Sequence, residues 1–382
     1  MRKHKVPILI PAVTIILCWT LLTDATEKTP GTLEYLELFS QCFELVQSRY
    51  LESTDPVILA EGAIEGMMLE TSHYAALQPR SGSSGLIPPW GPVELGVIIG
   101  FHEPMIRVID VLPGSIAESK GIQPGDTIIR INDQVTPFLP VDRAARMLTG
   151  QPGDSLEILT QSHLTLDINE LTIEFQPVEA MEPVQGWSIT EVDPVRIIRF
   201  AGDPGPDTAA SLYDALTVQP DMPTILDLRH MNRGPVHVGI QLADLFIGDG
   251  VDILATCDTG NKILSTIPAG DGRALTNCPL AVIIDQTSSG PAETCAAALQ
   301  AVNRATIIGD RSFGMAVQRE TRMLSDEYNV VLVTGWFCMP DGRPIHPQGI
   351  TPDMPVQLPI ADDGDAYLDT ALLQVSRSSI RT

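Results

Sequence analysis

The sequence has few basic residues, few cysteines and only one long apolar run. Its 382 residues include 24 Lys and Arg against 48 Asp and Glu, which gives a formal net charge of -24. Such a field repels phosphate groups, so the composition argues against a general nucleic-acid binder or a protein that coats anionic membranes. With 44% hydrophobic residues the chain can bury a sizeable core, and its length suggests two or three domains.

The cysteines are scattered and contain no Cys-x-x-Cys pair. One lies in the N-terminal apolar run, and the others are Cys42, Cys257, Cys278, Cys295 and Cys338. This spacing signals neither a metal site nor a disulfide framework, and no cofactor is expected. If the compartment is oxidising, the bridge we predict joins Cys257 to Cys278. Most of the cysteines are expected to be small core residues.

The long apolar run, Val6–Leu22, follows a basic start at Arg2, Lys3 and Lys5. We predict that residues 1–26 are a signal peptide or a membrane anchor. As a helix the run spans roughly 25 Å, slightly short of a hydrocarbon core of ~30 Å, so both alternatives stay open. The protein is therefore expected to be exported, and either membrane-anchored or periplasmic (extracytoplasmic).

The composition along the chain divides it into further regions. Residues 27–80 carry apolar side chains at helical spacing between Leu33 and Leu69, with an N-cap pattern at Asp55-Pro56, and they suggest an oligomerisation or packing module. Residues 81–92, rich in Ser, Gly and Pro, read as a linker. Residues 93–178 contain short strands and one helix, and residues 186–375 alternate strands with helices.

Alternation of strands and helices predicts an α/β layer architecture with right-handed crossovers. The predicted buried strands are Val195–Phe200, Thr224–Leu228, Ala281–Asp285, Thr306–Gly309 and Val330–Thr334. The predicted helices are Asp207–Thr217, Val236–Ile247 and Pro291–Val302.

The stretch PGSIAESKGIQPGDTIIRIND, residues 113–133, together with Leu95–Ile99, resembles a PDZ domain. The resemblance implies that an extended peptide is bound as an added strand and that backbone amides hold its terminal carboxylate. The implied partners are protein C-termini or other extended peptides. The implied groove is lined by Leu95, Gly96, Val97, Ile98 and Ile99 of the strand and by Ala144, Met147 and Leu148 of the helix Val141–Leu148.

Further segments extend this resemblance to most of the chain: ILDLRHMNRGP, PAETCAAALQAVNRATIIGDRSFGMAVQ and GRPIHPQGITPDMPV. Together with the PDZ pattern, residues 33–358 resemble the carboxyl-terminal processing proteases, or tail-specific serine peptidases. The implied fold is a crotonase-like α/β core with an inserted PDZ β-domain and an N-terminal helical region.

Members of that family cleave proteins near their C-termini with a serine nucleophile and a lysine base. The serine stands three residues before a Glu, and the lysine follows the Phe-Gly of a later loop. Aligned on Glu293 and on Phe313-Gly314, the serine position holds Gly290 and the lysine position holds Met315. Lys262 is also the last lysine of the chain. The resemblance therefore predicts a family member that is catalytically inactive.

The loop that helps to form the family's oxyanion hole also departs from the pattern. Here it reads DLRHMNRGP, with Arg233 in place of a glycine and only Gly234 retained. A substitute dyad would use Ser288 or Ser289 as nucleophile and His230 or His346 as general base. Moving a nucleophile by one residue re-aims its side chain relative to the oxyanion donors, which weighs against this alternative. Cys295, inside a predicted helix, is expected to be a core residue.

Three functions are compatible with these patterns. The first is an exported homologue of the family that binds protein C-termini or unfolded peptides through its PDZ groove and has lost peptide-bond hydrolysis; it could pair with an active homologue or with itself. The second is an active serine endopeptidase with a relocated nucleophile. The third is a structural envelope protein whose N-terminal helices assemble oligomers.

Overall fold

A computed structural model describes residues 31–80, 95–175, 186–200, 204–270, 274–275, 277–356 and 365–379. The predicted signal or anchor at 1–26 and the predicted linker at 81–92 lie outside these residues. The chain divides into two compact units, Met1–Ile64 and Glu65–Thr382. Among the helices within the described ranges, none is both long and apolar enough to cross a membrane.

Two helices confirm the helical prediction for the N-terminal region: α2 (Thr32–Arg49) and α3 (Pro56–Thr71). Asp55 caps α3 as expected, since its Oδ1 accepts a hydrogen bond from the backbone N of Val57 at 2.8 Å. Neither helix buries a residue. A cavity of about 550 Å³ in the first unit is lined mainly by apolar side chains, among them Phe39, Phe43, Val46, Ile58 and Leu59.

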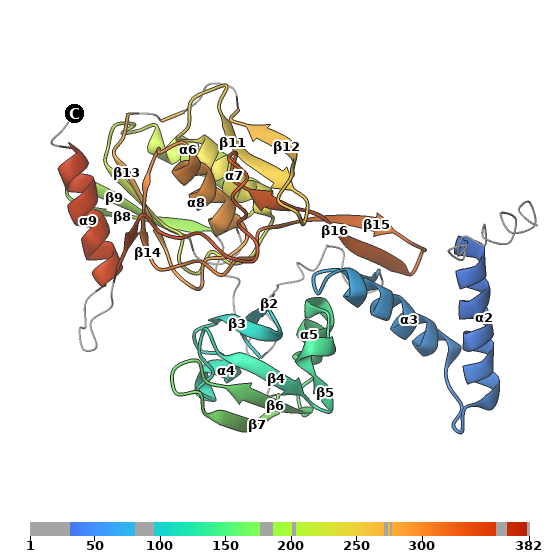
Figure 1. Cartoon of the computed structure of the whole chain (residues 1–382). Helices are drawn as coiled ribbons and strands as arrows, with labels where there is room; N and C mark the ends of the chain where they lie inside the picture. The colour runs from blue at the N-terminus through green and yellow to red at the C-terminus, as the bar shows by residue number, and fades with distance from the viewer. Residues whose placement is uncertain are drawn as a thin grey trace, which may run out of the picture. The chain divides into compact units, whose positions relative to one another are not determined.

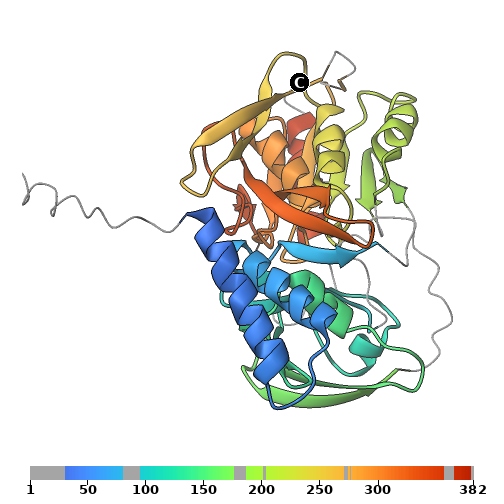
Figure 2. The same cartoon turned by 90° about the vertical axis from the view of Figure 1, so that its right-hand side faces the viewer.

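The PDZ-like segment forms its own sheet in the order β2-β3-β4-β6-β7, with β5 paired to β4. Figure 2 shows these strands, in cyan to green, with their short helices. The strands are β2 (Val97–His102), β3 (Met105–Val111), β4 (Thr127–Ile131), β5 (Gln134–Val135), β6 (Ser155–Gln161) and β7 (Ile168–Glu174). The helices are α4 (Ile116–Ser119), η1 (Thr136–Phe138) and α5 (Val141–Met147).

The α/β region is built on a second sheet, in the order β17-β14-β13-β10-β9-β8. Its strands are β8 (Trp187–Val192), β9 (Val195–Phe200), β10 (Thr224–Asp227), β13 (Leu280–Ile284), β14 (Thr306–Gly309) and β17 (Met354–Pro355). All of its neighbouring strands are parallel except β8, which runs antiparallel to β9. The predicted strands at 195–200, 224–228, 281–285 and 306–309 are thereby confirmed.

Helices cover both faces of this parallel sheet (Figure 1). One face packs on α6 (Thr208–Leu216), α7 (Val236–Asp244) and α8 (Pro291–Ala301), which confirms the three predicted helices. The other face packs on α9 (Ala366–Ser379), through Tyr367, Ala371 and Val375. Ile197 and Ile198 of β9 point to opposite faces and belong to different hydrophobic clusters. The region therefore has the α/β layer architecture that the alternating pattern predicts.

A third sheet carries the disulfide and corrects one prediction. Its order is β1-β16-β11-β12, with β15 paired to β16. Its strands are β1 (Ala76–Pro79), β11 (Asp252–Cys257), β12 (Ile263–Pro268), β15 (Val317–Met323) and β16 (Tyr328–Cys338). The bridge joins Cys257 to Cys338, so the predicted pairing of Cys257 with Cys278 is wrong. The antiparallel pairing of β11 with β16 brings the sulfur atoms of Cys257 and Cys338 together. Cys278 instead lies just before β13, and its thiol forms no disulfide.

Candidate functional site

The turn between β13 and α8 is the centre of the candidate site. Gly290 stands directly before α8 with φ 55° and ψ -105°, a backbone conformation that L side chains rarely adopt. Space is not what requires glycine there, because a Cβ atom at this position would meet only Val236 Cγ1, at 3.9 Å. Strained backbone of this kind clusters at functional sites. The turn thus combines a strained backbone with room for a side chain.

The carboxylate of Glu293 ties this turn to the loop at 312–315. Its Oε2 accepts hydrogen bonds from the backbone N of Gly290 at 3.0 Å and of Met315 at 2.6 Å. Its Oε1 accepts from Ser312 Oγ at 2.6 Å and from the backbone N of Gly314 at 2.5 Å. One buried carboxylate oxygen therefore brings residues 290 and 315, which are far apart in the sequence, into adjacent positions.

Burial raises the pKa of Glu293 to about 7, although the hydrogen bonds from Ser312, Met315, Gly314 and Gly290 oppose the shift. The side chain is fully buried. Desolvation disfavours the charged form of a carboxyl group, while donors aimed at it favour that form, and here the first effect is larger. Glu293 is consequently a titrating group near neutral pH in the middle of the candidate site.

Met315 fills the second of these positions with an apolar side chain. It is 3% exposed and belongs to the hydrophobic cluster that also contains Ile99 of β2 and Tyr74. Beside it, Phe313 packs so closely on β2 that a Cβ atom on Gly100 would lie 2.6 Å from its ring. The loop at 312–315 is thus held between Glu293 on one side and the apolar face of β2 on the other.

The two serines before Gly290 hold the turn in place. Ser288 Oγ donates to the carbonyl of Leu228 at 3.0 Å and accepts from the backbone N of Asp285 at 3.1 Å. Ser289 Oγ donates to the carbonyl of Asn232 at 3.3 Å. Both side chains are completely buried. Each hydroxyl proton is therefore directed to a backbone carbonyl rather than to a base.

His230 forms a pair with Asp110, a residue that the sequence did not single out. His230 Nδ1 lies 2.9 Å from Asp110 Oδ2, and Asn232 Nδ2 donates to the same oxygen at 2.7 Å. The hydrogen bond to Asp110 raises the pKa of His230, while burial opposes the shift. The imidazole is 63% exposed. The pair could act as a base towards a bound molecule, but it is not hydrogen-bonded to Ser288 or Ser289.

The loop that carries His230 is fixed at its start by ion pairs. Arg229 binds the carboxylates of Asp227 and Asp365 through its guanidinium group. Further along, Gly234 has φ 91°, in the left-handed region that favours glycine. Arg233 and Gly234, the residues of the oxyanion-type loop, therefore follow a rigid anchor and lie on a turn next to α7.

The contacts and burial of His346 and Cys295 indicate structural roles for both residues. His346 Nδ1 lies 2.7 Å from the carbonyl of Gly314, and burial lowers the pKa of the imidazole. Cys295 is completely buried in α8, and burial raises the pKa of its thiol to about 12. A thiol is a nucleophile only as the thiolate, so Cys295 is an inert core residue as expected.

Comparison with known proteins gives two matching family models: "PDZ domain" over residues 88–161 and "Peptidase family S41" over residues 194–356. A carboxyl-terminal-processing protease of Synechocystis sp. is 30% identical over 366 residues, with coverage of 87% of this chain and 84% of that protein. A carboxy-terminal-processing protease of Bartonella bacilliformis is 25% identical over 359 residues, covering 90% of this chain and 80% of that one.

The chain belongs to the family of carboxyl-terminal processing proteases. The solved structure titled "Photosystem II D1 C-terminal processing protease" has the same fold, with a TM-score of 0.63 at 19% identity over 84% of this chain and 92% of that one. The α/β core with an inserted PDZ domain, predicted from the sequence, is confirmed.

Of the residues predicted to line the PDZ groove, Val97, Ile98 and Ile99 lie in β2 and Ala144 and Met147 in α5, whereas Leu95 and Gly96 precede β2 and Leu148 follows α5. Leu95, Val97, Ile98, Ile99, Ala144 and Leu148 are all buried, with at most 1% of each exposed, whereas Met147 is half-buried. Gly96 has φ 82°, and a Cβ atom there would lie 2.1 Å from Ser115 Cβ. A glycine is thus needed where the chain turns into β2.

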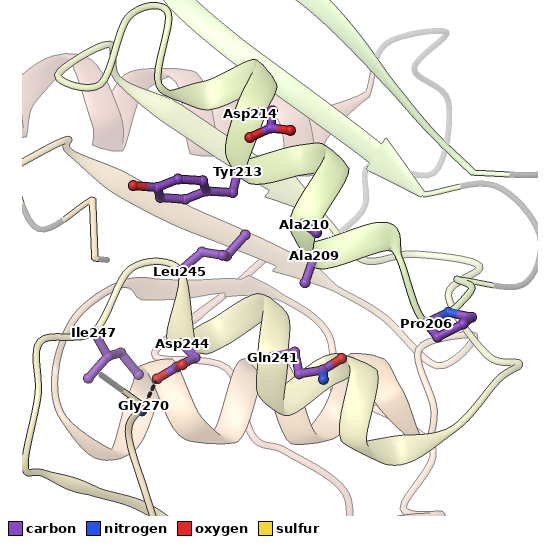
Figure 3. Close-up of a pocket in the computed structure, with 10 residues that line it drawn as sticks. All are labelled: Pro206, Ala209, Ala210, Tyr213, Asp214, Gln241, Asp244, Leu245, Ile247 and Gly270. Atoms are coloured by element: carbon purple, nitrogen blue, oxygen red, sulfur yellow. Dashed lines mark hydrogen bonds between the residues drawn. The ribbon is translucent and has the colours of Figure 1, made fainter. Parts of the chain in front are cut away.

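A separate cavity of about 320 Å³ lies on the α6–α7 side of the core (Figure 3). It is lined by Tyr213, Asp214, Gln241, Asp244 and other residues, and Asp244 Oδ1 accepts a hydrogen bond from the backbone N of Gly270 at 2.6 Å. None of its lining residues was singled out from the sequence. In the described ranges no group of three or more His, Cys, Asp or Glu side chains could hold a metal ion.

The structure thus brings together part of what the sequence pointed to. Gly290 and Met315 meet at Glu293, while Ser288 and Ser289 are used to hold the turn. Sequence reasoning placed Glu293 at a helix N-terminus and missed its bonds to the 312–315 loop. It also missed Asp110, whose partner His230 lies 120 residues away.

Proposed function

We propose that this chain is a carboxyl-terminal processing protease homologue that binds protein C-termini or extended peptides and has lost peptide-bond hydrolysis. The observation that carries the proposal is the pair of residues at Glu293. Family resemblance assigns the nucleophile to position 290 and the base to position 315, and the backbone nitrogens of these residues share one carboxylate oxygen. Glycine and methionine at these adjacent positions supply neither a hydroxyl group nor an amine.

The cost of this loss is large. Removing an essential nucleophile or base from a serine peptidase lowers turnover by roughly a millionfold. No lysine follows Lys262 in the sequence, so no amine from the C-terminal third replaces the missing base. The function that remains supported is recognition of peptides, because PDZ domains bind an extended chain along a sheet edge.

Export is part of the proposal. The basic start and the apolar run Val6–Leu22 support it, and so does the disulfide between Cys257 and Cys338, since disulfides persist in oxidising compartments. We also propose the domain boundaries given above: 1–26, 27–80, 81–92, 93–178 and 186–375.

Peptide binding tests the proposal directly. A random library of C-terminal hexapeptides, screened against the whole chain, should yield peptides whose binding disappears when the carboxylate is amidated. Gly96→Val should abolish binding, because any Cβ there collides with Ser115. Gly153→Ala is the matched control: Gly153 also has a positive φ, 99°, but open space around it. Equal binding of amidated and free peptides would contradict the proposal without requiring any variant to fold.

The second candidate, an active peptidase with a relocated nucleophile, is favoured only by the pairing of His230 with Asp110. It requires Ser288 or Ser289 to react with a serine-directed phosphonate. Their buried, carbonyl-bonded hydroxyls support the expectation that neither is labelled under conditions that label an active family member. Labelling at either serine, located by peptide mass spectrometry, would favour the second candidate.

The third candidate function, that of a structural protein, is supported by the exposed apolar side chains of α2 and α3. Leu33 is 80% exposed and Ile58 68% exposed. Apolar helix faces of this kind are typical of surfaces that associate with another partner. Peptide binding that depends on a free carboxylate would exclude this candidate as the sole function, since it assigns no ligand to the PDZ groove.

A further inference from the structure

β2 is the end strand of the PDZ sheet, so one of its edges faces no other strand of that sheet. β2 pairs antiparallel with β3, so that Gly100 lies opposite Arg107. His102 lies opposite Met105, and a turn of two residues joins this last pair. Backbone groups of successive residues in a strand point alternately to its two edges. Val97, Ile99 and Phe101 therefore present their N–H and C=O groups to the outer edge, where a peptide strand would add.

At Phe101, a side chain of the same protein already makes hydrogen bonds with the backbone groups that face the outer edge. The hydroxyl of Tyr74 donates to the carbonyl of Phe101 at 2.8 Å and accepts from its backbone N at 3.1 Å. These are the two hydrogen bonds that one residue of an added antiparallel strand would make with Phe101. Tyr74 is 3% exposed, so its hydroxyl is held firmly in this position.

The neighbouring residue closes the space between β2 and α5. The imidazole of His73 stacks on the ring of Phe101, with ring centroids 3.5 Å apart. The carbonyl of His73 accepts a hydrogen bond from the backbone N of Val141, the first residue of α5, at 2.9 Å. Residues 73 and 74 thus bridge the strand and the helix at the Phe101 end of the groove.

This blockage fixes the direction of a bound peptide. A terminal carboxylate needs free backbone amides, and those at Phe101 are occupied, so the carboxylate end lies at the other end of β2, near Gly96. With its last residue opposite Val97, an antiparallel peptide would place its fifth residue from the end opposite Phe101. We propose that Tyr74 ends the peptide-binding groove there, so that the domain reads only about the last four residues of a bound C-terminus.

The inference rests on the proposed function, because it sets the length of the sequence that the PDZ domain recognises. The experiment uses the whole chain and the best-binding peptide from the C-terminal library. Nested versions of three, four, five, six and eight residues, all with the same free carboxyl end, are titrated by calorimetry against the wild type, Tyr74→Ala, Tyr74→Phe and Tyr213→Phe. The last variant is the matched control, since Tyr213 lies on α6 of the α/β region.

For the wild type and Tyr213→Phe, affinity should rise up to four residues and then stay constant. Tyr74→Ala removes both the ring and the hydroxyl group from the edge of β2, so affinity should continue to rise up to six residues, by about threefold to tenfold over the tetrapeptide. Tyr74→Phe removes only the hydroxyl group, and because its ring still covers the edge, affinity should stay constant beyond four residues.

Two results would overturn the inference while leaving C-terminal binding intact. One is a wild type whose affinity increases by at least threefold between four and six residues. The other is a constant affinity beyond four residues in a folded Tyr74→Ala variant. Absence of carboxylate-dependent binding at every length, in wild type and variants alike, would instead overturn the proposed function and this inference with it.

Discussion

At the scale of single residues, the candidate site centres on a turn whose glycine adopts a backbone conformation that other residues rarely adopt. Gly290 adopts φ 55° with open space at the Cβ position. For a residue other than glycine, this conformation costs about 1–3 kcal/mol.

Restoring both side chains tests the assignment of these two positions. We expect Gly290→Ser combined with Met315→Lys to react with a serine-directed phosphonate at the introduced hydroxyl, because a lysine at 315 would lie among apolar groups that lower its pKa and leave it neutral. Gly290→Ser alone and Met315→Lys alone are the controls, and neither should be labelled. A folded double variant that remains unlabelled would show that residues 290 and 315 do not form the dyad.

Glu293 gives the protein a pH-dependent stability. Its pKa is raised from 4.5 to about 7 in the folded chain, so the folded state holds a proton that the unfolded state releases. The resulting stabilisation is fully present below pH 4.5 and is lost as the pH rises through 7. The free energy of unfolding should therefore fall across this interval, by an amount on the order of 3 kcal/mol.

Denaturant titrations at pH 4.5, 6, 7 and 8 measure this effect. Glu293→Gln should lose the part of the pH dependence that Glu293 contributes, and it should also be less stable at every pH because its amide group faces two of the four donors that the carboxylate accepts from. Glu327→Gln, at an exposed position, should keep the wild-type pH dependence. A Glu293→Gln variant with the same pH dependence as the wild type would exclude Glu293 as its source.

At the scale of helices and strands, the buried strands of the α/β sheet were predictable, whereas the extent of the partly exposed strand β16 was not. Thr306–Gly309 was predicted with its observed bounds, because a short apolar run between turn residues indicates a buried strand. By contrast, β16 extends to Tyr328–Cys338, well beyond the predicted 330–334, since most of it pairs in a partly exposed ribbon with β15. Exposed pairing of this kind leaves little apolar pattern in the sequence.

The site shows the same division. The strand-turn-helix that carries Gly290 follows from local pattern and capping, with Pro291 in the first turn and Gly290 before it. The pairing of Cys257 with Cys338, 81 residues apart, and that of Asp110 with His230 depend on which strands are neighbours in space. Strand order cannot be read from the spacing of cysteines or carboxylates, and the disulfide was accordingly mispredicted.

The disulfide should stabilise the sheet that supports the 312–317 loop. Cys338 is next to Phe337, whose backbone N donates to the carbonyl of Ala316. We expect Cys338→Ala to lower the free energy of unfolding by about 2–5 kcal/mol, measured by denaturant titration without reductant. Cys42→Ala, at an exposed position in α2, should change it little. Equal stability of wild type and Cys338→Ala without reductant would contradict a structural role for the bridge.

At the scale of the whole molecule, the chain combines the family's order of parts with glycine and methionine at positions 290 and 315, where the resemblance places the serine and the lysine. The PDZ family model matches before the peptidase family model along the chain, as the sequence patterns indicated. The fold agrees with that of a solved family structure. Fold and family alone would assign peptide hydrolysis to this protein, but activity belongs to the site and not to the fold. The account therefore depends on whether the intact protein cleaves anything.

The most direct measurement is proteolysis of an unfolded protein substrate with a free C-terminus by the purified whole chain, analysed by mass spectrometry beside an active family member. The account predicts no cleavage by the wild type above the substrate-only control and no change in Ser288→Ala, Ser289→Ala or His230→Ala. Cleavage by the wild type that is abolished in any of these three variants would contradict it.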